Sequence, residues 1–338
     1  MENKVLTVGI IGMGIGKYHA DAVMRTENAR LTWICDVDEG VLAKMQENYQ
    51  APHACTDYRE MLEDPDLDCV IIGTPDQLHK QMTEDALAAG KHVLCEKPLA
   101  LTREDIEAIV AAAKKSDKKF MVGQVCRYTP GFVKAKELID AGEIGELTFI
   151  ESEYAHDYEK ILTGIHSWRQ DPLRYGVVGG GCHAVDLLRW IAGNPELIEA
   201  FGTHKTFKDI TVIDDTHIAI MRFPNDVIGK VFCSISCRRD YTMRSVFYGT
   251  KGTIITDNTS PELTLFQMNE EGVSIPTKIP VEVNNHNMFG EFAEFYDIIV
   301  NDKPVGTNAM EGANTIAACL AIVESANTNM PVIPQYFD

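Results

Sequence analysis

The first 124 residues alternate short apolar runs with amphipathic stretches of helical periodicity. Strands and helices that alternate at this spacing form βαβ units, and such units build a parallel sheet. This pattern predicts an α/β domain at the N-terminus. The expected strands are Leu6–Ile11, Leu31–Asp36, Cys69–Ile72, His92–Cys95 and Phe120–Val122, and the expected helices lie near 15–26, 38–48, 77–89 and 103–116.

A different pattern begins after about residue 124. In the stretch 227–237, apolar and polar residues alternate, which is typical of a half-buried strand in a mainly antiparallel sheet. Residues 249–252, Gly-Thr-Lys-Gly, indicate a turn between two strands, and two helical stretches near 292–299 and 309–326 close the chain. We therefore predict two domains, 1–124 and 125–338, the second an α/β domain with a mainly antiparallel sheet.

Length and charge exclude several classes of protein. A chain of 338 residues is too long for one ordinary core. Its net charge of −19 disfavours nucleic acid as a partner, and no apolar run reaches the ~18 residues of a membrane span. The first residues lack the pattern of a signal peptide. Because the nine cysteines are scattered, we expect reduced thiols and a cytoplasmic location.

A glycine-rich turn follows the first expected strand, at Gly12, Gly14 and Gly16 around Ile15. Such a turn lets the pyrophosphate of a dinucleotide approach the start of a helix, although the third glycine comes one residue earlier than usual. Asp36 ends the second strand, where a carboxylate accepts hydrogen bonds from ribose hydroxyls and repels a 2′-phosphate. The glycine-rich turn and Asp36 together favour NAD over NADP. A simple tight turn and a helix-capping Asp36 are the alternatives.

Two further segments carry candidate chemical groups. Lys97 lies in Glu96-Lys97-Pro98 after the fifth strand, where a lysine can transfer protons, although a surface ion pair is the commoner case. His183 follows three glycines, and Asp186 one turn later would orient it or cap the helix. Neither Cys182 with His183 nor Cys233 with Cys237 has the spacing of a closed zinc site, so we expect no metal.

Taken together, these segments resemble the glucose–fructose oxidoreductase/inositol dehydrogenase (Gfo/Idh/MocA) family over nearly the whole chain. The resemblance implies a Rossmann domain, a second domain with an open sheet, a cofactor held between them, and a homodimer or homotetramer. It is carried by the Gly12/Gly14 turn with His19, Gly73 to Asp76 with His79, Glu96-Lys97-Pro98, Gly123 to Arg127 with Pro130, Trp168-Arg169, and Gly181 with His183 and Asp186.

The resemblance also implies roles for individual residues. Lys97 and His183 match the catalytic lysine and histidine. Many relatives place an aspartate where this chain has Gly179, so the usual carboxylate is missing, and Asp157, His156, Tyr158 and Tyr175 are candidates to replace it. The cofactor would contact Gly12, Gly14, Ile15, Gly16, Asp36, Thr74, Pro75, Asp76, His79, Glu96, Lys97, Arg127, Trp168 and Arg169. The substrate would contact Lys97, Arg127, His156, Tyr158, Trp168 and His183.

These features together predict an NAD-dependent oxidoreductase that oxidises a hydroxyl of a sugar, polyol, inositol or sugar derivative to a ketone or lactone. Two alternatives remain open. One is an enzyme that oxidises a sugar only transiently to allow glycosidic cleavage or elimination, and the other is a regulator that senses the nucleotide without catalysis. The sequence does not choose among particular sugars.

Overall fold

The structure, a computed structural model, describes residues 5–164 and 167–338 and divides into two compact units. The first unit comprises the chain up to Gln124 together with Met288–Ala313. The second comprises Val125–Asn287 and Asn314–Asp338. The segment Met288–Ala313, which the sequence analysis assigned to the second domain, thus packs with the first unit.

Six parallel strands form the sheet of the first unit, in the order β3-β2-β1-β4-β5-β6. This is the strand order of a doubly wound Rossmann sheet, with its switch point between β1 and β4. Four of the five expected strands match their predicted bounds, and β2 is shifted by one or two residues. The strands are β1 (Leu6–Ile11), β2 (Ala29–Cys35), β3 (His53–Cys55), β4 (Cys69–Ile72), β5 (His92–Cys95) and β6 (Phe120–Val122).

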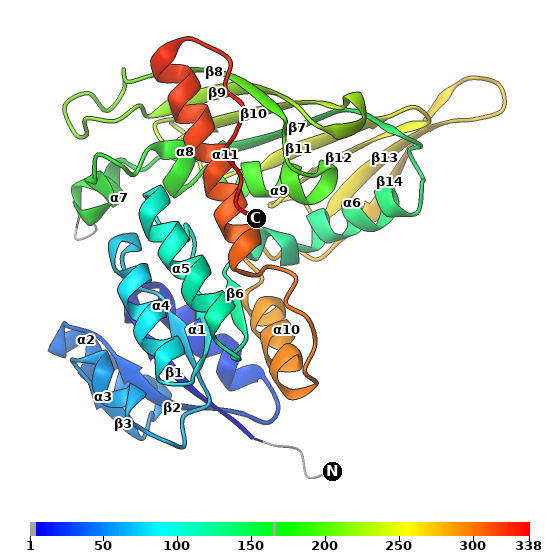
Figure 1. The fold of residues 1–338 in the computed structure, drawn as a ribbon. Coiled ribbons are helices and arrows are strands. Elements are labelled where there is room, and N and C mark those ends of the chain that lie inside the picture. The colour runs from blue at the N-terminus through cyan, green and yellow to red at the C-terminus, as the bar shows by residue number, and fades with distance from the viewer. Residues whose placement is uncertain (1–4, 165–166) are drawn as a thin grey trace. The chain divides into compact units, whose positions relative to one another are not determined.

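Helices cover both faces of this sheet (Figure 1). Thr102 caps the start of helix α5, because its hydroxyl oxygen accepts a hydrogen bond from the backbone N–H of Asp105 at 3.1 Å. A late helix, α10, packs against α1, and the guanidinium of Arg25 lies 4.4 Å from the Phe289 ring centre. The helices are α1 (Met13–Arg25), α2 (Glu39–Tyr49), α3 (Tyr58–Leu62), α4 (His79–Ala88), α5 (Arg103–Lys115) and α10 (Met288–Val300).

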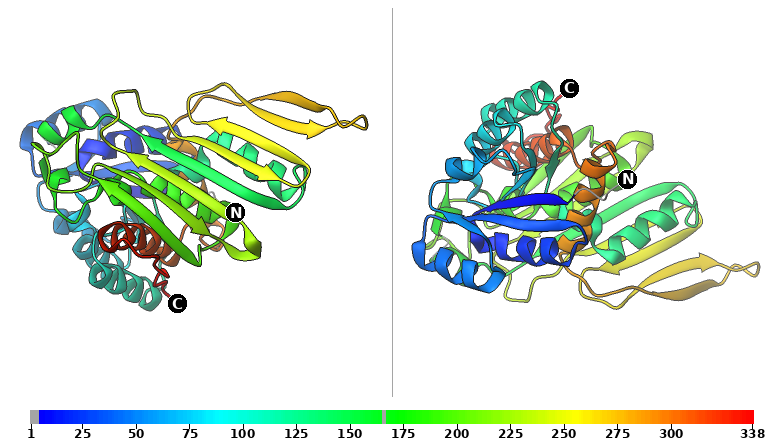
Figure 2. Two further views of the ribbon diagram at one scale, coloured as in Figure 1. Left: turned by 90° about the horizontal axis from the view of Figure 1, so that it is seen from above. Right: turned by 90° about the horizontal axis from the view of Figure 1, so that it is seen from below.

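The second unit is built on an eight-stranded sheet in the order β14-β13-β12-β11-β7-β10-β9-β8 (Figure 2). Only β7 and β10 run parallel, so the expected mainly antiparallel sheet is confirmed. The turn at 249–252 joins β11 and β12, as predicted. The strands are β7 (Leu147–Ala155), β8 (Leu197–Thr203), β9 (Thr216–Arg222), β10 (Ile228–Ser234), β11 (Arg244–Gly249), β12 (Gly252–Asp257), β13 (Glu262–Met268) and β14 (Ser274–Pro280).

Helices cover one face of this sheet. Helix α9 (Cys182–Ala192) packs on β7 and β10, and α6 (Pro130–Asp140) packs on β12 and β13. On β9 every second side chain is buried, including His217, Ala219 and Met221, while Ile218 and Ile220 are exposed. The period of two therefore separates a packed face from an apolar face that is open in the single chain. The long helix α11 (Ala309–Thr328) links the two units in sequence.

None of the helices within residues 5–164 and 167–338 combines the length and apolar character that a membrane crossing requires.

Candidate functional site

The glycine-rich turn lies at the carboxyl ends of β1 and β4, at the switch point of the first unit's sheet. Gly12 caps α1 with φ of +87°, and a Cβ there would lie 2.7 Å from the carbonyl oxygen of Gly73. A Cβ on Gly16 would lie 2.7 Å from Ile10 Cγ2, so Gly16 allows α1 to pack closely on β1. The irregular glycine spacing therefore still provides both the turn and the close packing.

Gly14 and Ile15 complete this turn. No heavy atom of the described chain outside its immediate neighbours lies within 4 Å of a Cβ built on Gly14, so the start of α1 is open there. The Ile15 side chain instead lies against the backbone of Gly73, and its Cγ2 atom is 2.8 Å from the position of a Cβ built on Gly73. A helix start that no side chain covers at Gly14 suits a pyrophosphate.

Asp36 follows β2 and faces the start of the same helix. One carboxylate oxygen accepts a hydrogen bond from the Met13 N–H at 2.8 Å, and the other accepts from the Asp38 N–H at 3.0 Å. Each oxygen keeps a second lone pair for a ribose hydroxyl. The capping role that was the alternative for Asp36 belongs to Asp38, which accepts hydrogen bonds from the N–H groups of Gly40 and Val41.

The segment after β4 holds a fully buried histidine. Nδ1 of His79 lies 2.9 Å from the Pro98 carbonyl oxygen, and Nε2 lies 3.1 Å from the Thr74 carbonyl oxygen. Since both partners only accept hydrogen bonds, the doubly protonated ring satisfies both. Burial lowers the pKa of His79, but Cys95, the buried Asp76 and the Pro98 carbonyl outweigh it and raise that pKa to about 9.

Pro75 precedes the short 3-10 helix Asp76–Leu78 that leads into α4. With Thr74, these residues stand at the carboxyl edge of the sheet beside the Gly12 turn, because β1 and β4 are neighbours. The structure thus brings the expected adenosine- and nicotinamide-contacting segments of the first unit to one sheet edge.

Lys97 follows β5 at this edge and is half-buried. Next to it, the buried Glu96 carboxylate lies 2.9 Å from Nε2 of His19 and accepts a hydrogen bond from the Lys97 backbone N–H at 3.1 Å. Burial raises the pKa of Glu96, but the His19 hydrogen bond and the Lys97 cation lower it more, so Glu96 is ionised. The Glu96 carboxylate therefore anchors the backbone that carries Lys97.

Glu291 on α10 is a member of this group that the sequence analysis missed. It is fully buried, and neither carboxylate oxygen has a hydrogen-bond partner within the described chain. Burial and the negative charge of Glu96 raise its pKa well above the usual value, while the Lys97 cation acts in the opposite direction. A neutral carboxyl thus stands near the charged pair Glu96 and Lys97. A charged residue within the apolar face of a predicted helix was the only signal for it.

In the second unit, His183 begins α9 and is 3% exposed. It lies in a cluster of aromatic and imidazole rings. The Tyr154 ring stacks on it at 6.1 Å with an interplanar angle of 26°, and the His286 ring centre lies 5.3 Å away. Tyr241 contacts both Tyr154 and His286, with ring centres 5.2 and 5.5 Å apart.

The expected substrate residues His156 and Tyr158 join this cluster. Their rings meet edge to face at 4.8 Å, and the hydroxyl oxygens of Tyr158 and Tyr154 are 2.6 Å apart. Burial lowers the pKa of His156, and its Nδ1 is buried without a hydrogen-bond partner in the described chain. Burial raises the pKa of Tyr241, which therefore keeps its hydroxyl proton. The cluster offers flat apolar ring faces and hydrogen-bonding groups, which are the features of a small-molecule site.

Arg127 and Asp186 form a buried ion pair. The Arg127 Nε and Nη2 atoms each donate to one Asp186 oxygen at 2.8 Å. The side chains are 9% and 4% exposed, and Thr315 Oγ1 donates to the same carboxylate at 2.8 Å. The hydrogen bonds that the structure describes for the Asp186 carboxylate come from Arg127 and Thr315 and not from the backbone N–H groups at the start of α9. Its expected role of capping the helix is thus replaced by an ion pair that joins α9 to the segment after Gln124.

At Gly179 a side chain would collide with the buried Arg174, whose Nη1 lies 2.1 Å from where a Cβ would stand. Arg174 Nη2 donates to the Gly179 carbonyl oxygen at 3.3 Å. A guanidinium thus fills the space that an aspartate would need. The Trp168 ring lies between two cations, with the guanidinium carbons of Arg169 and Arg174 at 4.4 and 5.1 Å from its centre.

The two remaining candidates to replace that carboxylate are engaged elsewhere. Asp157 accepts a hydrogen bond from Arg238 Nη1 at 3.0 Å on the surface, and the Tyr175 ring packs edge to face with His217 at 6.1 Å. The ring cluster instead contains residues that the sequence analysis did not select. These are Cys126, Tyr154, Tyr241 and His286, which come from four separate segments and carry no common motif.

Comparisons with known proteins agree with this architecture. Residues 6–124 match the model of the oxidoreductase family with an NAD-binding Rossmann fold, and residues 132–255 match the model of the GFO/IDH/MocA C-terminal domain. The chain therefore belongs to the GFO/IDH/MocA oxidoreductase family, as its sequence motifs predicted.

Individual relatives include sugar and inositol dehydrogenases. Myo-inositol 2-dehydrogenase of Thermotoga maritima is 30% identical over 79% of this chain and 79% of its own. Levoglucosan dehydrogenase of Pseudarthrobacter phenanthrenivorans is 28% identical over 75% of this chain and 74% of its own. The structure of a levoglucosan dehydrogenase in complex with NADH superposes with a TM-score of 0.90 at 24% identity, covering 98% of this chain and all of that one, and shows the same fold.

Proposed function

We propose that this chain is an NAD-dependent dehydrogenase that oxidises a hydroxyl group of a sugar, polyol, inositol or sugar derivative to a ketone or lactone. The carrying observation is the carboxyl edge of the first unit's sheet, where Lys97 follows β5 while the Gly12 turn and Asp36 follow β1 and β2. Two dehydrogenase relatives of this chain are named for inositol and levoglucosan, which supports a polyol or sugar as the substrate.

The residues of this edge fit a nicotinamide dinucleotide. The open start of α1 suits the pyrophosphate, and the free lone pairs of the Asp36 carboxylate support its role as acceptor of hydrogen bonds from the adenosine ribose. Because a 2′-phosphate would bring negative charge against Asp36, we assign NAD rather than NADP. When bound, the cofactor supplies the acceptor for a hydride.

Lys97 acts as the base that removes the proton from the substrate hydroxyl, and the Glu96 carboxylate holds its backbone in position. In the second unit, the rings of His156, Tyr158 and His183 bind the substrate through stacking and hydrogen bonds. Trp168, Arg169 and Arg127 were expected to contact ligand as well. Since Nε and Nη2 of Arg127 both donate to Asp186, we assign Arg127 to the support of α9.

The open face of the second sheet favours a homo-oligomer. Phe201, Ile218 and Phe232 stand opposite one another on β8, β9 and β10, and Phe201 and Ile218 are 61% and 41% exposed. Phe232 is half-buried, and neighbouring apolar side chains that are at least partly exposed on three paired strands are typical of an interface. We propose that a second copy covers this face. All nine cysteines are free thiols, which supports the cytoplasmic location expected from the sequence.

The test follows reduced nicotinamide by absorbance while the purified protein is incubated with NAD⁺ or NADP⁺ and a panel of inositols, aldoses and sugar acids. We expect turnover with NAD⁺ and one class of substrate. Replacing Lys97 by Met lowers kcat by roughly 10²–10⁴-fold while NADH binding persists. Lys80→Met is the matched control, because Lys80 is an exposed lysine paired only with Asp105 at 3.5 Å.

Unchanged turnover of Lys97→Met would contradict the role of Lys97, and a preference for NADP⁺ would contradict the assignment of Asp36. Product formation without accumulation of NADH would instead support the enzyme that oxidises its sugar only transiently. Binding of NAD without any product would support the regulator.

A further inference from the structure

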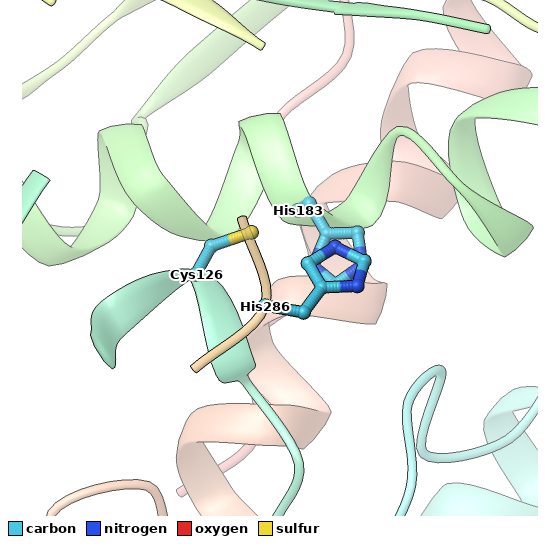
Figure 3. Close-up of side chains that lie close together, drawn as sticks. All are labelled: Cys126, His183 and His286. Atoms are coloured by element: carbon cyan, nitrogen blue, oxygen red, sulfur yellow. The ribbon is translucent and has the colours of Figure 1, made fainter. Parts of the chain in front are cut away.

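Three potential metal ligands converge in the ring cluster of the second unit. Cys126 comes from the 3-10 helix Val125–Tyr128, His183 from the first turn of α9, and His286 from the segment between β14 and α10. One ligand atom from each residue lies within 4.8 Å of the other two (Figure 3). The residues are far apart in the sequence, which is why spacing alone indicated no metal.

The surrounding residues hold this group in place. Cys126 and His183 are 2% and 3% exposed, whereas His286 is half-buried. The Tyr241 hydroxyl lies 3.2 Å from Nε2 of His286, and the sulfur of the buried Met243 lies 3.5 Å from the Cys126 sulfur. Histidine ligands of metals are commonly oriented by such a second hydrogen bond.

The types of ligand favour a borderline or soft metal ion over a hard one. A thiolate with two imidazoles suits Zn²⁺, whereas Mg²⁺ and Ca²⁺ require oxygen ligands. Zinc sites with three protein ligands keep the fourth tetrahedral position for water or substrate. We propose that Cys126, His183 and His286 bind one Zn²⁺ ion whose open position takes a hydroxyl oxygen of the substrate. The role in substrate binding rests on the proposed dehydrogenase function, whereas the metal site itself does not.

The distances require only a small adjustment. Zinc with bonds of about 2.3 Å to sulfur and about 2.1 Å to nitrogen needs ligand atoms roughly 3.4–3.6 Å apart. From a spacing of at most 4.8 Å, inward shifts of about 1 Å by each ligand atom achieve this. The Cys126 thiol loses its proton on binding, and its negative charge offsets half of the charge of the ion.

A zinc ion in this position would lower the pKa of the bound hydroxyl, so that the oxygen would pass its proton to Lys97, the base of the proposed dehydrogenase, near neutral pH. The carbon then becomes a carbonyl by releasing a hydride, with both electrons, to NAD⁺, while zinc keeps its charge. His183 would thus hold the metal and would not carry the proton itself. This supplies the electrostatic support for which the chain has no aspartate at position 179.

The first test measures metal binding without any cofactor or substrate. The full-length protein is stripped with a chelator under reducing conditions, and Zn²⁺ is titrated with metal content measured by mass spectrometry. We expect one Zn²⁺ per chain. In Cys126→Ser and His286→Gln the affinity for Zn²⁺ should fall by more than roughly 10–100-fold, which is the loss expected when only a supporting hydrogen bond is removed. Cys237→Ser and His204→Gln, which alter the same residue types elsewhere in the unit, should bind as the wild type does.

Binding of Co²⁺ provides a second measurement, which does not depend on the stability of the protein. Co²⁺ in the site should show the absorption of a tetrahedral thiolate complex, and Cys126→Ser should lose the thiolate band. Circular dichroism of the metal-free variants establishes that they are folded. The site is overturned if the wild type binds Zn²⁺ no more tightly than Cys126→Ser, or if the cobalt spectrum shows no thiolate.

Assays of NAD⁺ reduction with and without zinc distinguish a failure of the metal proposal from a failure of the proposed dehydrogenase function. If the metal-free protein reduces NAD⁺ as fast as the zinc-loaded one, the substrate role of the metal is overturned and the dehydrogenase stands. If zinc binds at these three residues but no substrate is oxidised in any metal state, the metal site is supported and the dehydrogenase is contradicted.

Discussion

Replacing Arg127 by Met tests the buried ion pair that ties α9 to the start of the second unit. The substitution removes both donors that Asp186 accepts at 2.8 Å and keeps a side chain of similar length. Asp186, only 4% exposed, then retains the Thr315 hydroxyl at 2.8 Å and the more distant Arg189 at 3.8 Å. The carboxylate is left buried with much of its charge uncompensated.

Breaking a buried pair by removing one partner costs about 3–5 kcal/mol. Because Thr315 and Arg189 still face Asp186, we expect a loss near the lower end, about 3 kcal/mol. The double variant Arg127→Met/Asp186→Leu should lose much less than the sum of the single variants, since no unpaired charge remains at the pair. Arg189 keeps hydrogen bonds to Asn194 at 2.8 Å and to Thr315 at 2.5 Å in that variant.

Urea unfolding followed by tryptophan fluorescence measures these free energies. In a Trp33→Phe background the remaining tryptophans, Trp168 and Trp190, both belong to the second unit, so the signal reports on that unit. Lys134→Met is the control. It breaks an exposed pair with Glu137 at 2.9 Å and should cost less than about 1 kcal/mol. If Arg127→Met costs no more than this control, or if the two single variants add without coupling, the reasoning about the buried pair is refuted.

Three further predictions concern the first unit. Folding raises the pKa of His79 from 6.5 to about 9, so the protonated ring stabilises the fold by about 3 kcal/mol below pH 6.5, and this contribution is lost as the pH rises through 9. The variant His79→Gln should abolish this dependence of the unfolding free energy on pH. An NMR titration in which the ring loses its proton below pH 7 would contradict the raised pKa. Burial raises the pKa of Glu291, so the wild type loses stability as the pH rises above 4.5, the pKa of this group in the unfolded chain. The variant Glu291→Gln should therefore stabilise the protein at pH 7 and have little effect at pH 4. An equal effect at the two pH values would argue against a neutral carboxyl. Gly12→Ala should lower both stability and NADH binding, measured by thermal unfolding and NADH fluorescence, because φ of Gly12 is +87° and a Cβ there would lie 2.7 Å from the Gly73 oxygen. Gly14→Ala should lower NADH binding alone. Unchanged NADH binding in both variants would place the pyrophosphate elsewhere.

The sequence was sufficient for most of the first unit because its signals are local. The strands Leu6–Ile11, Cys69–Ile72, His92–Cys95 and Phe120–Val122 are short apolar runs between amphipathic helices, and the Gly12 turn and Thr102 cap follow from backbone geometry within a few residues. Two short elements, β3 and α3, went unnoticed because three to five residues carry too little periodicity to detect.

Only the tertiary structure decided which distant side chains meet. Arg127 is bound to Asp186, α10 packs with the Rossmann unit and not with the domain that precedes it in sequence, and Arg174 fills the space beside Gly179. The grouping of Cys126, His183 and His286 belongs to the same class. Hydrophobic periodicity and turn chemistry act over a few residues and can be read along the chain. Ion pairs and ligand clusters depend on how whole elements pack, and no short stretch of sequence contains that information.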